Sequence, residues 1–197
     1  GESGLPGPLE IKVSYSIQND GALKIEISAE SEKPTFCNPA FHGYWCLNER
    51  GLSGHKLTIH ADHFLPTNEA LIPTGEIQSV DGTPYDLRQP KALPAEISLD
   101  TNFCLNGSGL REAARLETDE LEMIVETDAP GLQVYDAARL DTTPVLGHSG
   151  NPYGGHAGIA MEPQVWPDAP NQENFPSITL RPGERFSQRS FFRFIRK

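Results

Sequence analysis

LEIKVSYSIQNDGALKIEISAE, residues 9–30, is the stretch that decides the fold. Apolar and polar residues alternate in 9–17 and again in 22–30, which is the period of a β-strand with one buried face. Asn19-Asp20-Gly21 separates the two runs, and its glycine supplies the positive φ that a tight turn requires. The stretch therefore predicts an antiparallel hairpin. Five apolar residues share one face of its first strand: Leu9, Ile11, Val13, Tyr15 and Ile17.

The same alternation recurs along the rest of the chain, without a convincing helix of three turns. It is found in residues 55–61, 114–127, 131–137 and 184–195, and the second of these is expected to form a hairpin about Thr118-Asp119-Glu120. Residues 65–97 are rich in proline and turn residues, so we expect a long excursion with only short strands there. The pattern predicts one domain over residues 1–197, all-β, built as an antiparallel β-sandwich.

Composition limits the classes of partner. The 197 residues carry a formal net charge of -11, which argues against binding to nucleic acid or to an anionic membrane surface. The sequence has neither an apolar run of the roughly 20 residues that span a bilayer nor a recognisable signal peptide. A neutral or small partner is expected.

The cysteines indicate the compartment. Cys37, Cys46 and Cys104 are odd in number, and their spacing fits no zinc pattern. Free thiols of this kind are typical of a reducing compartment, so we expect a cytoplasmic protein.

Glu162 is the sharpest candidate for chemistry. It lies in GIAMEPQVWPDAPN, residues 158–171, where an apolar run leads into a segment stiffened by prolines. Burial there would raise the pKa of the carboxyl toward neutrality, as a general acid or base requires. The alternative is a salt bridge to an arginine.

Three further candidates each allow two interpretations. His42 stands among aromatic residues in CNPAFHGYWCLNERG, residues 37–51, and either lines a pocket or is a hydrogen-bonded core histidine. Asp100 either accepts hydrogen bonds from ligand hydroxyls or caps the end of a strand. His60 and His63 lie three residues apart, a spacing that would suit a metal on a helix, but their surroundings indicate a strand.

Several long motifs, in order, resemble the aldose 1-epimerase (galactose mutarotase) family. GESGLPGPLEIKVSYSI is similar to the family's glycine-rich entry to a strand, and FHGYWCLN resembles its His-x-Tyr-Phe-Asn-Leu segment. ADHFLPTNEALIPTGEIQSVDGTPYDLRQP and DTNFCL are similar to its long central stretch and to its Asp-x-Asn-Phe-x-Leu. GIAMEPQVWPDAPNQENFPSITLRPGE resembles its Glu-x-Gln-x-x-Pro-Asp-Ala-x-Asn segment. Together these motifs cover nearly the whole chain.

The resemblance implies a galactose mutarotase-like supersandwich that interconverts the α and β anomers of a free aldose, with neither cofactor nor metal. Glu162 would be the general base on the C1 hydroxyl and His42 the general acid on the ring oxygen, on opposite sides of the hemiacetal. Asp100 would bind sugar hydroxyls, and Tyr44 and Gln164 would add contacts to the sugar.

The sequence departs from the family in two respects. The family's N-terminal segment, with a second active-site histidine and a sugar-binding arginine, has no counterpart here, so we interpret the chain as the C-terminal two-thirds of an epimerase sandwich. A companion N-terminal chain is then an expected partner. Ala40-Phe41 and Trp45-Cys46 also replace the family's Thr-Asn and Phe-Asn around His42.

Two other functions stay open. A hexose-6-phosphate epimerase-like protein would need cations near the motifs, and Arg50, Arg88 and Arg139 are the candidates. A carbohydrate-binding relative without activity would share the sandwich.

Overall fold

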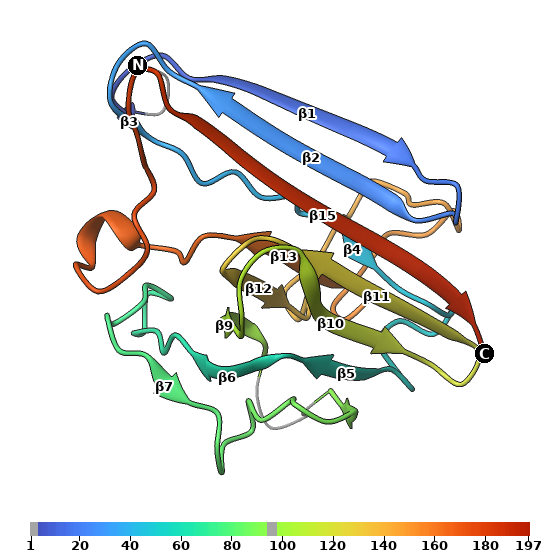
Figure 1. Cartoon of the computed structure of the whole chain (residues 1–197). Helices are drawn as coiled ribbons and strands as arrows, with labels where there is room; N and C mark the ends of the chain where they lie inside the picture. Colours follow the sequence, from blue (N-terminus) through green and yellow to red (C-terminus); the bar gives the residue numbers. More distant parts are fainter. Residues whose placement is uncertain (1–3, 94–97) are drawn as a thin grey trace.

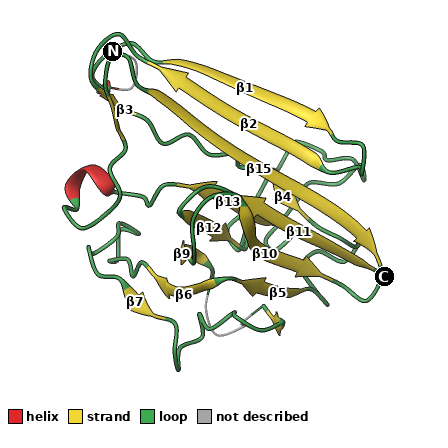
Figure 2. Ribbon diagram, viewed as in Figure 1, coloured by secondary structure: helices red, strands yellow, loops and turns green. Residues whose placement is uncertain are grey.

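Two large antiparallel sheets form the protein in the computed structural model, which describes residues 4–93 and 98–197 (Figure 1). The seven-stranded sheet has the order β1 (Glu10–Ile17), β2 (Leu23–Glu30), β15 (Arg185–Arg196), β11 (Leu121–Thr127), β10 (Arg111–Glu117), β5 (Lys56–Ile59) and β8 (Lys91–Ala92). The six-stranded sheet has the order β4 (Tyr44–Trp45), β13 (Ile159–Gln164), β12 (Gly131–Tyr135), β9 (Asp100–Leu105), β6 (Ala61–Phe64) and β7 (Gln78–Ser79). A small third sheet pairs β14 (Thr179–Leu180) with β3 (Thr35–Phe36), and a 3-10 helix, η2, spans Ala169–Asn171 (Figure 2).

Both predicted hairpins are confirmed. β1 pairs with β2 around the Asn19-Asp20-Gly21 turn, and Gly21 has φ 82° as the turn chemistry requires. β10 pairs with β11 around residues 118–120. The excursion over 65–97 contains only the short strands β7 and β8, and its residues 94–97 lie outside the described part.

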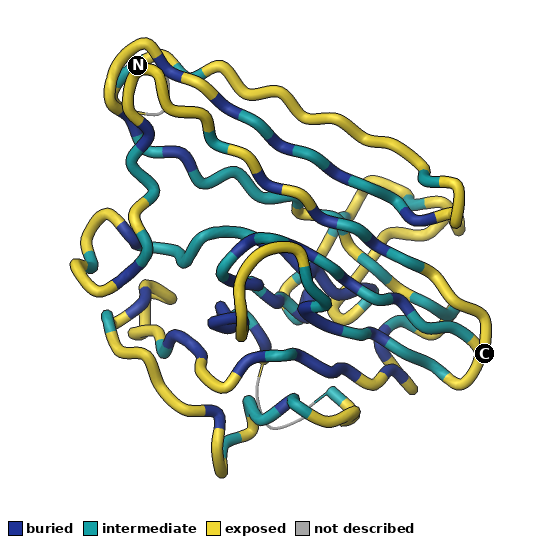
Figure 3. The backbone as a smooth tube through the Cα atoms, viewed as in Figure 1, coloured by how far each residue is buried: buried dark blue, intermediate teal, exposed yellow. Residues whose placement is uncertain are grey.

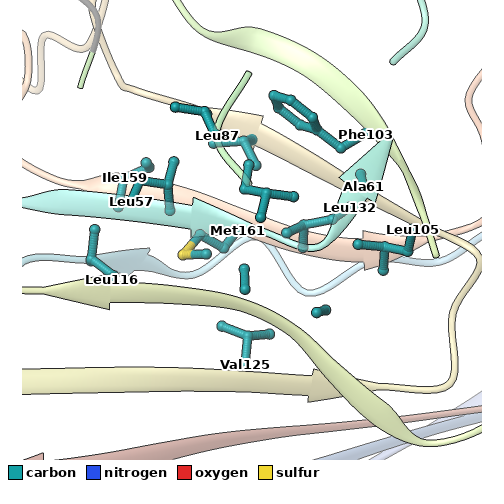
Figure 4. Close-up of a cluster of buried hydrophobic side chains, with 14 of the residues drawn as sticks. Leu57, Ala61, Leu87, Phe103, Leu105, Leu116, Val125, Leu132, Ile159 and Met161 are labelled. Atoms are coloured by element: carbon teal, nitrogen blue, oxygen red, sulfur yellow. The ribbon is translucent and has the colours of Figure 1, made fainter. Parts of the chain in front are cut away.

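The core lies between the two sheets, where one face of each strand supplies apolar side chains. Leu116 of β10 and Val125 of β11 face Leu132 of β12 and Met161 of β13, and all four are fully buried (Figure 4). Because side chains alternate across a strand, the polar residues between them lie on the outer face of each sheet. On the six-stranded sheet, this outer face carries the candidate site.

The apolar residues of the first strand share a face, as expected, but this face does not join the core, for Tyr15 is 60% exposed and Ile17 is 71% exposed. These residues pair with Ile25 and Leu23 of β2 and so continue the core-facing side of the sheet. β1 forms the outer edge of the seven-stranded sheet, and it is exposed along its length whereas β2 alternates (Figure 3). The sheet is therefore wider than the layer that covers it.

In the part of the chain that the structure describes, no helix has the length and apolarity needed to cross a membrane.

Candidate active site

The outer face of the six-stranded sheet presents polar side chains in rows that run across four strands. Tyr44, Ala160, Tyr135 and Asp100 occupy one row, because Ala160 pairs with Tyr44 and Tyr135, and Tyr135 pairs with Asp100. The next row holds Glu162, Gln133 and Asn102, again in direct register. Residues 118 positions apart in the sequence, Tyr44 and Glu162, thereby lie on one surface.

Glu162 and His42 lie side by side. The Nε2 atom of His42 is 3.5 Å from Oε1 of Glu162, and Glu162 is buried while the His42 side chain is 53% exposed. The exposure excludes the interpretation of His42 as a core histidine. Among the described residues, the ion-pair partner of Glu162 is this histidine and not an arginine.

The expected placement of the pair around the sugar needs correction. At 3.5 Å, a sugar ring does not fit between the two side chains. The hydroxyl oxygen and ring oxygen of a hemiacetal are bonded to the same carbon, however, so two neighbouring groups reach both of them. The geometry suits a sugar that lies over the pair and not between its members.

The surroundings of Glu162 adjust its acidity. Burial raises the pKa of the Glu162 carboxyl above its ordinary value, the charge of His42 lowers it, and the negative charge of Asp100 raises it further. A carboxylate with a raised pKa is a stronger base than an exposed one. Burial, together with Tyr135, Glu162 and Asp100, also raises the pKa of Tyr44, which keeps its hydroxyl protonated.

Aromatic packing fixes the segment that carries His42. Phe41 packs edge-on against Phe192 at 5.8 Å between ring centroids, and Trp45 stacks on the same ring at 4.7 Å. Two of the four residues that depart from the family pattern around His42, Phe41 and Trp45, therefore anchor this segment to β15 of the other sheet. Tyr44 lies between Phe41 and Trp45 in the sequence, and its side chain points to the opposite face of the sheet from that of Trp45. The centroids of the Tyr44 and His42 rings are 5.1 Å apart.

Asp100 is held by a residue that the sequence did not single out. Nε2 of Gln133 donates a hydrogen bond of 2.8 Å to Oδ1 of Asp100, and Gln133 stands between Glu162 and Asn102 in the strand register. In GLQVYDA, a glutamine between apolar residues looks like any solvent-facing position, so only the pairing of β12 reveals it. Asp100 is thus not only a cap at the end of a strand. Its carboxylate lies on the polar floor, the surface formed by Glu162, Gln133, Asn102 and Asp100.

The remaining expected residues also line this surface. The Tyr44 and Tyr135 ring centroids are 6.3 Å apart, with the small Ala160 between them in the register. Gln164 lines a hollow at the other side of the floor, together with Asp100 and Asn102. All five predicted site residues therefore lie on one face of one sheet.

His60 is engaged outside this surface. Nε2 of His60 lies 2.9 Å from Oε1 of Glu112 on β10. Within residues 4–93 and 98–197, no group of three potential metal ligands is found.

Comparison with known proteins agrees with the geometry. The family model of aldose 1-epimerases matches residues 1–193. The chain is 40% identical to the galactose mutarotase of Bos taurus over 98% of its length, and 34% identical to the aldose 1-epimerase of Escherichia coli K12 over 99% of its length. It spans about 60% of the length of these curated relatives.

Solved structures show the same likeness. An aldose epimerase homologue from C. elegans superposes with a TM-score of 0.93 at 29% identity, covering 99% of this chain and 62% of that one. A galactose 1-epimerase from Lactobacillus acidophilus gives a TM-score of 0.82 at 31% identity, covering 98% of this chain and 58% of that one. The predicted sandwich of the galactose mutarotase type is thereby confirmed, and the chain belongs to the aldose 1-epimerase family.

Proposed function

We propose that this chain carries the acid and base of an aldose 1-epimerase, which interconverts the α and β anomers of a free aldose. The observation that carries the proposal is the contact between His42 and buried Glu162 on a surface of polar side chains. A paired donor and acceptor is what ring opening of a hemiacetal needs.

In the proposed reaction, the two side chains exchange protons with the hemiacetal. Glu162 takes the proton of the C1 hydroxyl, the electrons of that O–H bond form the C1 carbonyl, and the bond from C1 to the ring oxygen breaks. Protonated His42 gives its proton to the ring oxygen, which leaves an open-chain aldehyde, a neutral imidazole and a carboxylic acid. Rotation about the C1–C2 bond presents the other face of the aldehyde. Closure with the two roles reversed gives the other anomer and restores the original protonation state.

The substrate is proposed to be an unphosphorylated sugar. Arg88, one of the three cations considered for phosphate, forms ion pairs with Asp62, Asp81 and Asp86. Its charge is therefore already compensated.

Polarimetry of freshly dissolved α-glucose and α-galactose tests the proposal in the full-length protein. Glu162→Gln keeps the size of the side chain and removes the base, so we expect mutarotation to slow by about 10²-fold or more. Glu32→Gln, at an exposed glutamate between β2 and β3, is the matched control and should equilibrate the sugars as fast as the parent. Equal rates for Glu162→Gln and the parent would show that the base is assigned wrongly. Calorimetric binding without any acceleration by the parent would favour the carbohydrate-binding alternative.

We also propose a companion segment and a compartment. The uncovered apolar face of β1, together with the greater length of the relatives, supports an N-terminal segment of the same protein that covers this face. Cys37, Cys46 and Cys104 are all free, which supports a reducing compartment such as the cytoplasm.

A further inference from the structure

The strand that carries Glu162 is paired along only part of one edge. β12 pairs with β13 from Ala160 to Gln164, but on the opposite edge β4 pairs only with Ile159 and Ala160. Beyond Ala160, this second edge has no partner strand among the described residues. Two side chains from other parts of the chain bind the backbone there instead.

The side chain of Asn38 binds the open edge three residues beyond Glu162. Its Nδ2 atom donates a hydrogen bond of 2.9 Å to the carbonyl of Val165, and its Oδ1 atom accepts one of 2.9 Å from the Val165 amide. A neighbouring strand would offer the same donor and the same acceptor from its backbone. The Asn38 amide therefore replaces a strand residue at this point.

A second side chain reaches the same edge from the other sheet. Gln188 of β15 is buried, and its Nε2 atom donates a hydrogen bond of 2.8 Å to the carbonyl of Pro163. Pro163 has no amide hydrogen to offer to a neighbouring strand. The backbone directly after Glu162 is thus held from inside the core.

Asn38 and β4 attach the segment that carries His42 to β13 at both of its ends. β4 pairs with β13 before Glu162, and Asn38 binds the chain after Glu162. Between these attachments lie five residues of the segment, 39–43, but only four of β13, 161–164. An extra residue makes a segment bulge away from its partner strand and redirects its side chains. His42 lies in this bulge, and its Nε2 is 3.5 Å from Oε1 of Glu162.

Asn38 is itself fixed by the residues on either side of it. β3 ends at Phe36 and pairs with β14, and the amide of Cys37 donates a hydrogen bond of 2.8 Å to the carbonyl of Ile178. Pro39 favours an extended backbone at the residue before it. The side chain of Asn38 therefore approaches β13 from a fixed base.

We propose that Asn38 is a positioning residue of the acid–base pair, whose side chain clamps residues 38–44 to β13 and so holds His42 against Glu162. The inference rests on the proposed function, which makes His42 the acid and Glu162 the base. Without the clamp, the packing of Phe41 on Phe192 would remain. The segment would then lose its alignment with β13 and not its attachment to the protein.

Asn38→Leu in the full-length protein tests the inference, since leucine has a similar volume and forms neither hydrogen bond. Misplacing one member of the pair weakens binding of the transition state more than binding of the sugar, so kcat for mutarotation should fall about tenfold or more with little change in KM. In a His42→Ala background the same substitution should cause almost no further loss, because Asn38 acts through His42. Asn19→Leu, at the exposed tip of the β1–β2 hairpin, is the matched control and should behave as the parent.

Titration of the Glu162 carboxyl detects the same displacement without any sugar. Its titratable neighbours are His42, which lowers the pKa of Glu162, Asp100, which raises it, and Tyr44. Moving His42 away removes the lowering influence, so the pKa of Glu162 should rise in Asn38→Leu, and the acid limb of kcat/KM should move to higher pH. The carboxyl 13C NMR signal, identified by its loss in Glu162→Gln, measures this pKa directly.

The outcomes separate the two proposals. Either an unchanged kcat or an unchanged pKa of Glu162 in a folded Asn38→Leu would overturn the role of Asn38, and so would a further tenfold loss in the His42→Ala background. If Asn38→Leu does not fold, Asn38→Ser takes its place. One hydroxyl oxygen cannot replace both amide atoms unless the backbone shifts, so the same changes are expected and their absence counts equally against the role.

Failure of the proposed function has a different signature. A parent that accelerates no mutarotation would overturn that function, and the NMR titration would still decide whether Asn38 holds His42 against Glu162.

Discussion

The carboxyl of Glu162 is influenced by two neighbours that act in opposite directions. Burial and the charge of Asp100 raise its pKa, and His42 lowers it. If Glu162 is the base, as proposed, it must be unprotonated at the start of the reaction, so we expect activity to fall as pH drops through this pKa. The acid limb of the pH profile therefore reports on the residues around Glu162.

Replacing Asp100 by asparagine should shift this limb in a defined direction. Asp100→Asn removes a negative charge that raises the pKa of Glu162, so that pKa falls and the acid limb of kcat/KM moves to lower pH. The position of the limb is independent of the loss of affinity that the change also causes. Polarimetric rates measured across the acid range check it. Asp119→Asn, at the exposed β10–β11 turn, is the control, and a limb that stays in place or moves upward contradicts the assignment.

Single residues also show how far the sequence could go in defining the site. Glu162, His42 and Asp100 were predicted because each is embedded in a long, recognisable motif. Gln133 and Asn102 were missed because both occupy polar positions in alternating strands, where a side chain that faces solvent and one that lines a site look alike. Only the register of β9, β12 and β13 brings them beside Asp100 and Glu162.

At the scale of elements, the packing of the segment around β4 between the two sheets sets the position of His42. A Cβ atom added to Gly43 would lie 2.4 Å from two atoms of the Phe41 ring. That ring is already packed against Tyr15 at 6.0 Å and Phe192 at 5.8 Å, so it cannot simply swing away. His42 stands between the two residues in the chain and would move with them.

Gly43→Ala should therefore impair activity more than stability. Misplacing a catalytic group by about 1 Å can cost up to about 10²-fold in rate, whereas overpacking of this kind destabilises by about 1–3 kcal/mol. We expect a fall of at least about tenfold in kcat/KM for mutarotation, in a protein that still unfolds cooperatively on heating. Gly154→Ala adds a methyl group where no atom lies within 4 Å and should change neither measurement. If the two variants behave alike, Gly43 does not position His42.

The predictability of elements depended on their length. The long strands β1, β2, β10, β11 and β15 follow from alternation, since eight or so residues are enough to show a period of two. β3, β4, β7, β8 and β14 contain two residues each, so their pairing is decided by tertiary contacts and no local pattern marks them. The strand that carries Tyr44 is one of these, which is why the resemblance, and not periodicity, located that part of the site.

For the whole molecule, the net charge limits the class of substrate, and the width of the seven-stranded sheet leaves part of its apolar face uncovered. The net charge of -11 disfavours approach of a sugar phosphate, in agreement with a pocket lined by Asp100 and by uncharged amides. The seven-stranded sheet, however, extends its apolar face beyond the second layer, to Val13 and Tyr15 of β1. The alternation predicted that these residues share a face, but it could not show whether the facing layer reaches them.

A substitution on β1 tests whether a companion segment covers this face. Val13 and Ser14 lie next to each other in β1 and point to opposite sides of the sheet. If an N-terminal segment of the same protein packs on the apolar side, Val13→Lys buries a charge and should destabilise the full-length protein by at least about 2 kcal/mol, while Ser14→Lys has little effect. Thermal or urea unfolding measures the difference, and intact mass establishes which polypeptides are present. Equal stability of the two lysine variants would mean that the apolar side of β1 faces solvent in the whole protein, as it does in residues 4–93 and 98–197, and that the proposed segment packs elsewhere.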